Sequence, residues 1–183
     1  SPMNGLLGTT ELLLQTELSV KQHRLADYAR RSAKGLLVII NDVLDFSTIE
    51  SGKLVLSIAE LDLRELLHEV LELNAEQAAA KSVDVLLYLP DALPATLQGD
   101  SIRLRQVLAN LVGNAVKFTE RGEVTVRATW TNRGPASIDL RFEIQDTGIG
   151  IPPDRIERVF DAFSPAASSM AREYGGTGLG LAI

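Results

Sequence analysis

Apolar and small residues recur at alternating spacings of four and three along one stretch, and this repeat constrains the fold most strongly. It occupies Leu25, Ala29, Ser32, Leu36, Ile39, Val43 and Phe46. Such a repeat is the a/d seam of a coiled coil or a helical bundle. The seam is widened on one flank, as a helix with several neighbours requires, by Ala33, Leu37, Ile40 and Leu44. Ser19 followed by Gln22 has the form of a capping box, so the helix is predicted to begin near Val20.

The segment before this helix also has apolar residues at helical spacing, namely Met3, Leu7 and Leu14, with glycines between them. We interpret it as the end of a first helix that turns into the second. A lone pair of helices buries too little surface, so the expected partner is a second copy, giving a dimeric four-helix bundle. The helical texture ends at Ser51-Gly52, which predicts a hairpin domain over residues 1–52 and a second domain over 53–183.

The second domain has the pattern of an α+β fold, with helices against one face of a mixed sheet. Asp62 with Glu65 predicts the start of a helix that runs to about Ala80. The sequence VDVLLYL then predicts a short buried strand, and residues 100–118 predict a helix. Two half-buried strands follow, over residues 123–130 and 138–146, joined by an Asn-Arg-Gly-Pro turn.

Composition excludes several classes of function. The net charge of −6 argues against a nucleic-acid binder, which usually presents a basic surface. The absence of cysteine excludes a disulfide framework, a cysteine zinc site and a thiol nucleophile. No run is long enough to span a bilayer and no signal peptide is present, so we expect a cytoplasmic protein. Anchoring of a full-length protein to the inner membrane would then come from segments outside this chain.

Asp146 stands where the alternation of the last strand predicts another inward-facing hydrophobe. A carboxylate aimed into the core could accept a hydrogen bond from an amino group, such as the exocyclic amine of adenine. Gly148 and Gly150 would let the backbone pass close to the base. A buried Asp146 that is satisfied by its own turn is the alternative.

The helix over residues 100–118 carries a polar stripe about 120° from its apolar face. The stripe comprises Arg103, Gln106, Asn110, Asn114 and Lys117, and the apolar face Leu104, Leu108, Leu111, Ala115 and Phe118. A solvated face is the ordinary explanation for one asparagine. Asparagine is a mediocre helix former, however, so two on one stripe suggest that their amide oxygens are needed. Such oxygens suit Mg²⁺ whose charge is balanced mainly by phosphates, and Lys117 would lie close enough to meet a phosphate.

A glycine-rich segment, GGTGLGLAI, closes the chain and ends in what looks like a helix start. Glycines and a helix N-terminus together let backbone N–H groups approach an anion. The segment is neither a Walker A loop nor a dinucleotide fingerprint. With Asp146 and the asparagine stripe it predicts a site for an adenine nucleotide.

These motifs resemble those of the sensor histidine kinases of two-component systems, in the hybrid-kinase style. NLVGNAVKFT is similar to the N box, DTGIGIP to the G1 box, FDAF to the F box, GGTGLGLAI to the G2 box and SPMNGLLG to the tail of the H box. The resemblance covers essentially the whole chain. It implies a dimerisation and histidine phosphotransfer hairpin followed by a Bergerat-type α/β sandwich that binds ATP and Mg²⁺. It also implies a response-regulator receiver domain as partner, in the same chain or a separate one.

The resemblance implies a role for each matching residue. Asn114 would bind Mg²⁺, Asn110 and Lys117 would lie beside the phosphates, and Asp146 would bind adenine between Gly148 and Gly150. Phe160 and Phe163 would anchor a lid over residues 164–175, from which Arg172 could reach the phosphates. The phosphate loop would comprise Gly176, Thr177, Gly178, Leu179 and Gly180.

Two departures from the family pattern bear on activity. The phosphoacceptor histidine is expected a few positions before Ser-Pro-Met-Asn, upstream of Ser1, and further strands are expected after Ile183. The chain is therefore interpreted as truncated at both ends, with no catalytic histidine of its own and no expected autophosphorylation. His68-Glu69 reproduces the acceptor dipeptide but lies on a polar helix face, and His23 has no neighbouring acid. Both are interpreted as surface residues.

Two other functions stay open at this point. An ATPase of the topoisomerase or mismatch-repair class would require a glutamate base where Asn110 stands. A non-catalytic scaffold that binds nucleotide for regulation would tolerate degenerate motifs, whereas the N, G1 and G2 boxes here are intact.

Overall fold

The computed structural model describes residues 2–94, 96–161 and 179–183. Its contacts divide the chain into two compact units, one up to Leu54 and the other from Val55 to Ala182. Among the described helices, none combines the length and the apolar character needed to cross a bilayer.

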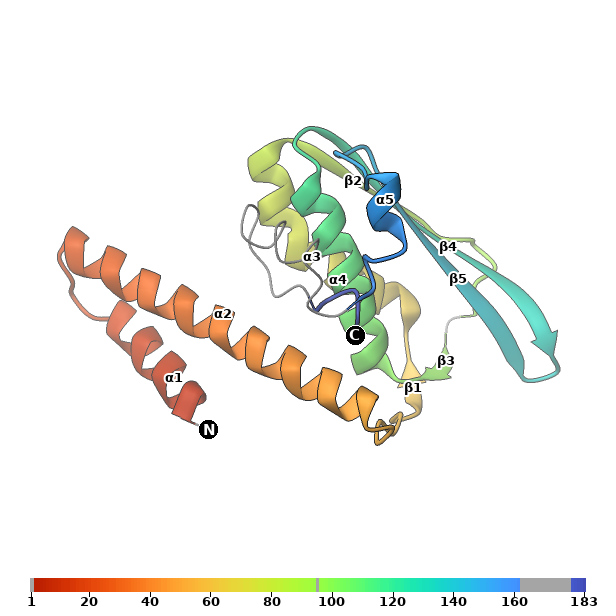
Figure 1. Cartoon of the computed structure of the whole chain (residues 1–183), viewed down its shortest axis with the longest axis horizontal. Coiled ribbons are helices and arrows are strands. Elements are labelled where there is room, and N and C mark those ends of the chain that lie inside the picture. Colours follow the sequence, from red (N-terminus) through yellow and green to blue (C-terminus); the bar gives the residue numbers. More distant parts are fainter. Residues whose placement is uncertain (1, 95, 162–178) are drawn as a thin grey trace. The chain divides into compact units, whose positions relative to one another are not determined.

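The first unit is a helical hairpin of α1 (Pro2–Leu14) and α2 (Val20–Glu50) (Figure 1). The predicted capping box is confirmed, because the Ser19 backbone N–H donates to Gln22 Oε1 at 3.0 Å and the Ser19 hydroxyl accepts from the Gln22 N–H. The helix ends at Glu50 with Ser51 as its C-cap, and the next residue, Gly52, has a φ of 65°. Local sequence signals therefore determine both ends of α2.

The two helices of the hairpin meet through small side chains. The buried residues are Ala26 and Ala33 on α2 and Thr10 on α1. The predicted a/d seam is left largely exposed in a single chain: Leu25, Leu36, Ile39 and Val43 all have exposed side chains. Such a continuous apolar stripe on a helix needs a further partner.

The second unit is built around a three-stranded mixed sheet. Its strands are β2 (Val83–Tyr88), β4 (Gly122–Gly134) and β5 (Ser137–Asp146), in the order β2-β4-β5. β2 pairs with β4 in parallel, and β4 with β5 antiparallel. Helices α3 (Leu63–Lys81) and α4 (Ser101–Phe118) run side by side across one face of this sheet (Figure 1). The predicted α+β arrangement is thus confirmed.

Smaller elements complete the unit. β1 (Ala59–Leu61) and β3 (Leu97–Gly99) form an antiparallel pair, and α5 (Pro153–Ile156) follows β5. The sequence did not predict β1 and β3, because three residues are too few for a recognisable alternation. The Asn132-Arg133-Gly134 segment, predicted as a turn, instead continues β4, so the chain reverses after it.

The core lies between the helices and the sheet. Its most deeply buried side chains are Leu63, Leu67, Val70, Leu108, Val112, Val116, Val124 and Val126. The buried face of α4 also includes Val112 and Val116, which the sequence did not place there. Of the predicted apolar face, Leu108 and Ala115 are buried, as expected. The other three predicted residues, Leu104, Leu111 and Phe118, are half-buried. The difference arises because α4 contacts both α3 and the sheet and buries a wider face than a single stripe.

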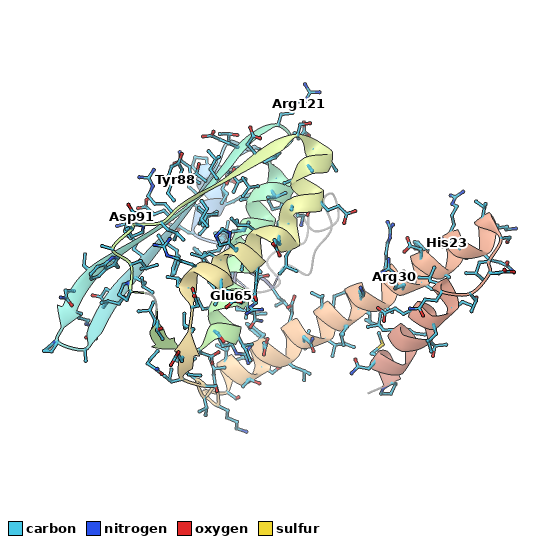
Figure 2. The ribbon with its side chains drawn as sticks, turned by 180° about the vertical axis from the view of Figure 1, so that it is seen from behind. His23, Arg30, Glu65, Tyr88, Asp91 and Arg121 are labelled. Carbon is cyan, nitrogen blue, oxygen red and sulfur yellow. The ribbon has the colours of Figure 1, made fainter. Side chains whose placement is uncertain are left out.

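The predicted burial of β2 was wrong on one face. Leu86 and Tyr88 are exposed, and Tyr88 lies 5.3 Å from the guanidinium of Arg127 on the neighbouring strand. Tyr88 is labelled in Figure 2 on the side of the sheet away from the helices. β2 is an edge strand whose outer face is uncovered in the described residues, so only its alternate residues reach the core.

Candidate functional site

The turn after β5 is attached to the C-terminal end of α4. The Ile149 N–H donates to the Phe118 carbonyl oxygen at 3.3 Å. A Cβ added at Gly148 would overlap that same oxygen and would lie 2.8 Å from the carbonyl carbon of Phe118. Glycine at this position thus permits the close approach that brings residues 146–150 against α4.

Asp146 has the predicted parity but not the predicted burial. It pairs with the fully buried Val124 and so lies on the inner face of the sheet, yet its own side chain is exposed. The expectation of a carboxylate within the core was wrong, because β5 ends here and the core ends with it. One carboxylate oxygen, Oδ1, accepts from the Gly148 N–H at 2.9 Å. Within the described residues, no hydrogen bond engages the second oxygen, Oδ2.

Large apolar side chains follow this carboxylate in the sequence, and they are exposed. Ile149 is 58% exposed and Ile151 47% exposed, and Ile156 and Phe160 are exposed further along. Gly150 between them has a φ of 68° and open space around its α-carbon. An unpaired acceptor beside exposed apolar side chains fits a flat heterocycle with an amino substituent.

Thr147 fixes the start of the turn to β4. Its hydroxyl accepts from the Glu123 N–H at 3.0 Å, and its backbone N–H donates to the Glu123 carbonyl at 3.2 Å. Gly122, with a φ of 118°, leaves room for the Thr147 side chain. The role of Thr147 is not visible in the sequence, because its hydrogen-bond partner, Glu123, lies on a different strand.

The polar stripe of α4 is half-buried rather than solvated. Asn110, Asn114 and Lys117 are all partly covered, and Asn110 Nδ2 donates to the Gly180 carbonyl at 3.2 Å. Leu179, next to Gly180, is almost completely buried. The structure therefore places Gly180, within the glycine-rich segment, beside Asn110 of the polar stripe.

Lys117 is held in an unfavourable environment for its charge. Burial lowers the pKa of its ammonium group below the usual lysine value, and the nearby charge of Lys81 adds to the effect. The Lys117 ammonium lies 4.9 Å from the centre of the Phe118 ring. An anion bound beside Lys117 would stabilise the charged form, as a phosphate group would.

The described residues suit a magnesium ion that is carried by phosphates. They contain no cluster of three or more histidine, cysteine or acidic side chains that could hold a metal on its own. Asn114 offers a neutral amide oxygen on the half-buried stripe. A metal at Asn114 would therefore take most of its ligands from phosphate oxygens and water, as Mg²⁺ does in nucleotide sites.

Several predicted site residues are not placed. Phe163, Arg172, Gly176, Thr177 and Gly178 lie outside the described residues. The two histidines are placed, and both His23 and His68 have exposed side chains. Figure 2 shows His23 near the beginning of α2.

Replacement of Gly148 by alanine tests the junction between α4 and the turn. The added methyl group must push the turn away from Phe118, so the Ile149 N–H should lose its acceptor and exchange with solvent at least about tenfold faster. Overpacking of this kind costs about 1–3 kcal/mol. Gly35→Ala is the matched control, because it adds the same methyl group to a helix where nothing lies within 4 Å. Unchanged exchange at Ile149 in Gly148→Ala would show that the close approach is unimportant.

Comparison with known sequences identifies both units. Residues 1–52 match the family described as "His Kinase A (phospho-acceptor) domain". Residues 99–183 match "Histidine kinase-, DNA gyrase B-, and HSP90-like ATPase". The fold and the site thus define a phospho-acceptor hairpin joined to an ATPase domain.

Known proteins are similar to this chain along its whole length. The chain is 45% identical over 183 residues to the sensor histidine kinase GacS of Pseudomonas protegens and 43% identical to the signal transduction histidine-protein kinase BarA of Escherichia coli. Each match covers all of this chain and 20% of the relative, so the chain spans about a fifth of their length. The crystal structure of full-length ShkA in complex with AMPPNP superposes with a TM-score of 0.75 at 38% identity, covering 99% of this chain and 36% of that one. The chain belongs to the sensor histidine kinase family.

Proposed function

We propose that this chain is the core of a histidine kinase that binds Mg-ATP and transfers its γ-phosphoryl group to a histidine N-terminal to Ser1. The observation that carries the proposal is the junction at the end of α4. There the carboxylate of Asp146 is held against the helix that carries Asn110, Asn114 and Lys117. One site thus combines an acceptor for a base with groups suited to phosphates.

Asp146 would select adenine over guanine. Its Oδ1 is already occupied by the Gly148 N–H, which leaves Oδ2 to accept from the 6-amino group of adenine. Guanine carries an oxygen at the corresponding position, and two acceptors facing one another repel. The exposed side chains of Ile149 and Ile151 would cover the faces of the ring.

The stripe on α4 would hold the phosphates. Asn114 would bind Mg²⁺, which neutralises phosphate charge when bound. The hydrogen bond from Asn110 to the Gly180 carbonyl would bring the glycine-rich segment over the same phosphates. The residues of that segment are Gly176, Thr177, Gly178, Leu179 and Gly180. The Lys117 ammonium would meet a phosphate, and Phe160, Phe163 and Arg172 would belong to the lid.

The hairpin would supply the dimer interface and the phosphotransfer surface. The exposed seam on α2 offers an apolar surface of the kind that a second copy covers in a four-helix bundle. The phosphoryl group would pass from the histidine to an aspartate of a receiver domain, in the same chain or a separate one. We infer a cytoplasmic location, because ATP is available there.

Labelling with γ-phosphate-labelled ATP tests the transfer. A protein extended upstream of Ser1 to include the histidine and its acidic neighbour should become labelled, and the label should resist alkali and be lost in acid. These 183 residues alone should bind Mg-ATP without becoming labelled. Labelling of the unextended chain that disappears in a His23→Ala or His68→Ala variant would contradict the assignment of the acceptor. Nucleotide binding by the extended protein without any labelling would favour a regulatory scaffold.

A further inference from the structure

Lys81, the last residue of α3, reaches across to the end of α4. Its side chain is partly buried, and its ammonium donates to the carbonyl oxygens of Val116 at 3.1 Å and Thr119 at 3.2 Å. It also donates to the carbonyl oxygen of Lys117. One cation thus binds three carbonyl oxygens at the end of α4, those of Val116, Lys117 and Thr119, so each of its three N–H donors has an acceptor within reach.

These bonds complete the C-terminal end of α4. The last four carbonyl groups of a helix have no partner within the helix. In α4 the Ala115 carbonyl accepts from the Thr119 N–H, and those of Val116 and Lys117 accept from Lys81. The fourth carbonyl, that of Phe118, accepts from the Ile149 N–H. Lys81 and the turn after β5 therefore bind adjacent carbonyls of one helical turn.

A positive charge is well suited to this place. The carbonyl end of a helix carries a partial negative charge, which a cation stabilises. Hydrogen bonds from a charged donor are also stronger than those from a neutral donor. A backbone held at three points by one ammonium group has little freedom to tilt, and the direction of the Phe118 carbonyl depends on that backbone.

We propose that Lys81 is a positioning residue for the nucleotide site. It fixes the last turn of α4 so that the Phe118 carbonyl can accept from the Ile149 N–H, with Gly148 packed closely against that carbonyl. The proposal rests on the proposed function for its ligand. Lys81 does not touch the base or the phosphates in this account. It acts through two hydrogen bonds, one from the Ile149 N–H to the Phe118 carbonyl and one from the Gly148 N–H to the Asp146 carboxylate.

A role limited to stabilising α3 and α4 is the competing explanation. Lys81→Met distinguishes the positioning role from this explanation, because methionine keeps the apolar stem but removes the ammonium. We expect the exchange of the Ile149 amide to rise at least about tenfold and the affinity for the ATP analogue AMPPNP with Mg²⁺ to fall about tenfold. Lys81→Arg keeps a cation with N–H donors and should lie between the wild type and Lys81→Met in both measurements.

Asp62→Ala is the matched control. Asp62 caps the opposite end of α3, roughly 28 Å away along a 19-residue helix, through bonds to Arg64 and Glu65. It should lower thermal stability while leaving Ile149 exchange and AMPPNP affinity near the wild-type values.

The outcomes separate this inference from the proposed function. Wild-type values for Ile149 exchange and AMPPNP affinity in Lys81→Met would overturn the positioning role. The role would also be overturned if Lys81→Arg or Asp62→Ala changed both quantities as much as Lys81→Met does. If the folded wild-type chain does not bind AMPPNP, the proposed function fails. Ile149 exchange in Lys81→Met and Lys81→Arg then still decides whether the lysine fixes the turn.

Discussion

Asp146→Asn is expected to lower the affinity of the chain for ATP at least about tenfold. The asparagine can keep its Oδ1 on the Gly148 N–H, where Asp146 Oδ1 accepts at 2.9 Å. Its NH₂ group then occupies the place of Oδ2 and faces the amino group of adenine, donor against donor. Loss of a hydrogen bond to a charged group costs about 1.5–3 kcal/mol, which corresponds to a tenfold loss or more. Calorimetric titration with ATP measures the effect.

Asp139→Asn provides the control for this substitution. Asp139 lies on the same strand, where its exposed carboxylate forms a surface ion pair with Arg133 at 3.4 Å. Such pairs contribute little to stability, and ATP affinity should not change. Equal ATP affinities for the wild type and Asp146→Asn would show that Asp146 does not bind the base.

Asn114→Ala is expected to reduce Mg²⁺-dependent phosphoryl transfer on the order of a hundredfold, as loss of one preorganised electrostatic contact does. Asn114 is the residue we assign to the metal, and transfer depends mainly on positioning and charge neutralisation. Binding of an adenine nucleotide without metal should survive, because Asp146 is unaffected. Asn114→Asp should also lose transfer, because it adds a negative charge beside the phosphates. The measurement is labelling of the protein extended upstream of Ser1.

Asn132→Ala makes the same chemical change at an exposed position of β4 and should leave the labelling rate unchanged. Full labelling in Asn114→Ala would remove Asn114 from the metal site. Loss of metal-free nucleotide binding in the same variant would show instead that Asn114 supports the fold of the pocket.

Features set by neighbouring residues were predictable from the sequence. The start of α2 follows from Ser19 and Gln22, and that of α3 from Asp62, because each cap forms within a few residues. The alternation that leads to Asp146 likewise predicted β5 and its inward face. Capping residues and the alternation of apolar and polar side chains are enough to predict such elements from the sequence.

Features set by distant packing were not predictable in the same way. The buried face of α4 also includes Val112 and Val116 because α3 and the sheet cover it from two sides. Asp146 is exposed because the core ends where β5 ends, which parity along one strand cannot indicate. Lys81 looks like an ordinary terminal lysine in the sequence, since its acceptors are 35 or more residues away. The close approach at Gly148 likewise depends on the Phe118 carbonyl, which only the fold brings there.

Calorimetric titration of the 183-residue chain with Mg-ATP and with Mg-GTP tests directly whether the site binds an adenine nucleotide. We expect one saturable ATP site per chain, with GTP bound at least about tenfold more weakly because its base presents an acceptor to Asp146. A folded chain that binds neither nucleotide, or that binds GTP as tightly as ATP, would contradict this expectation.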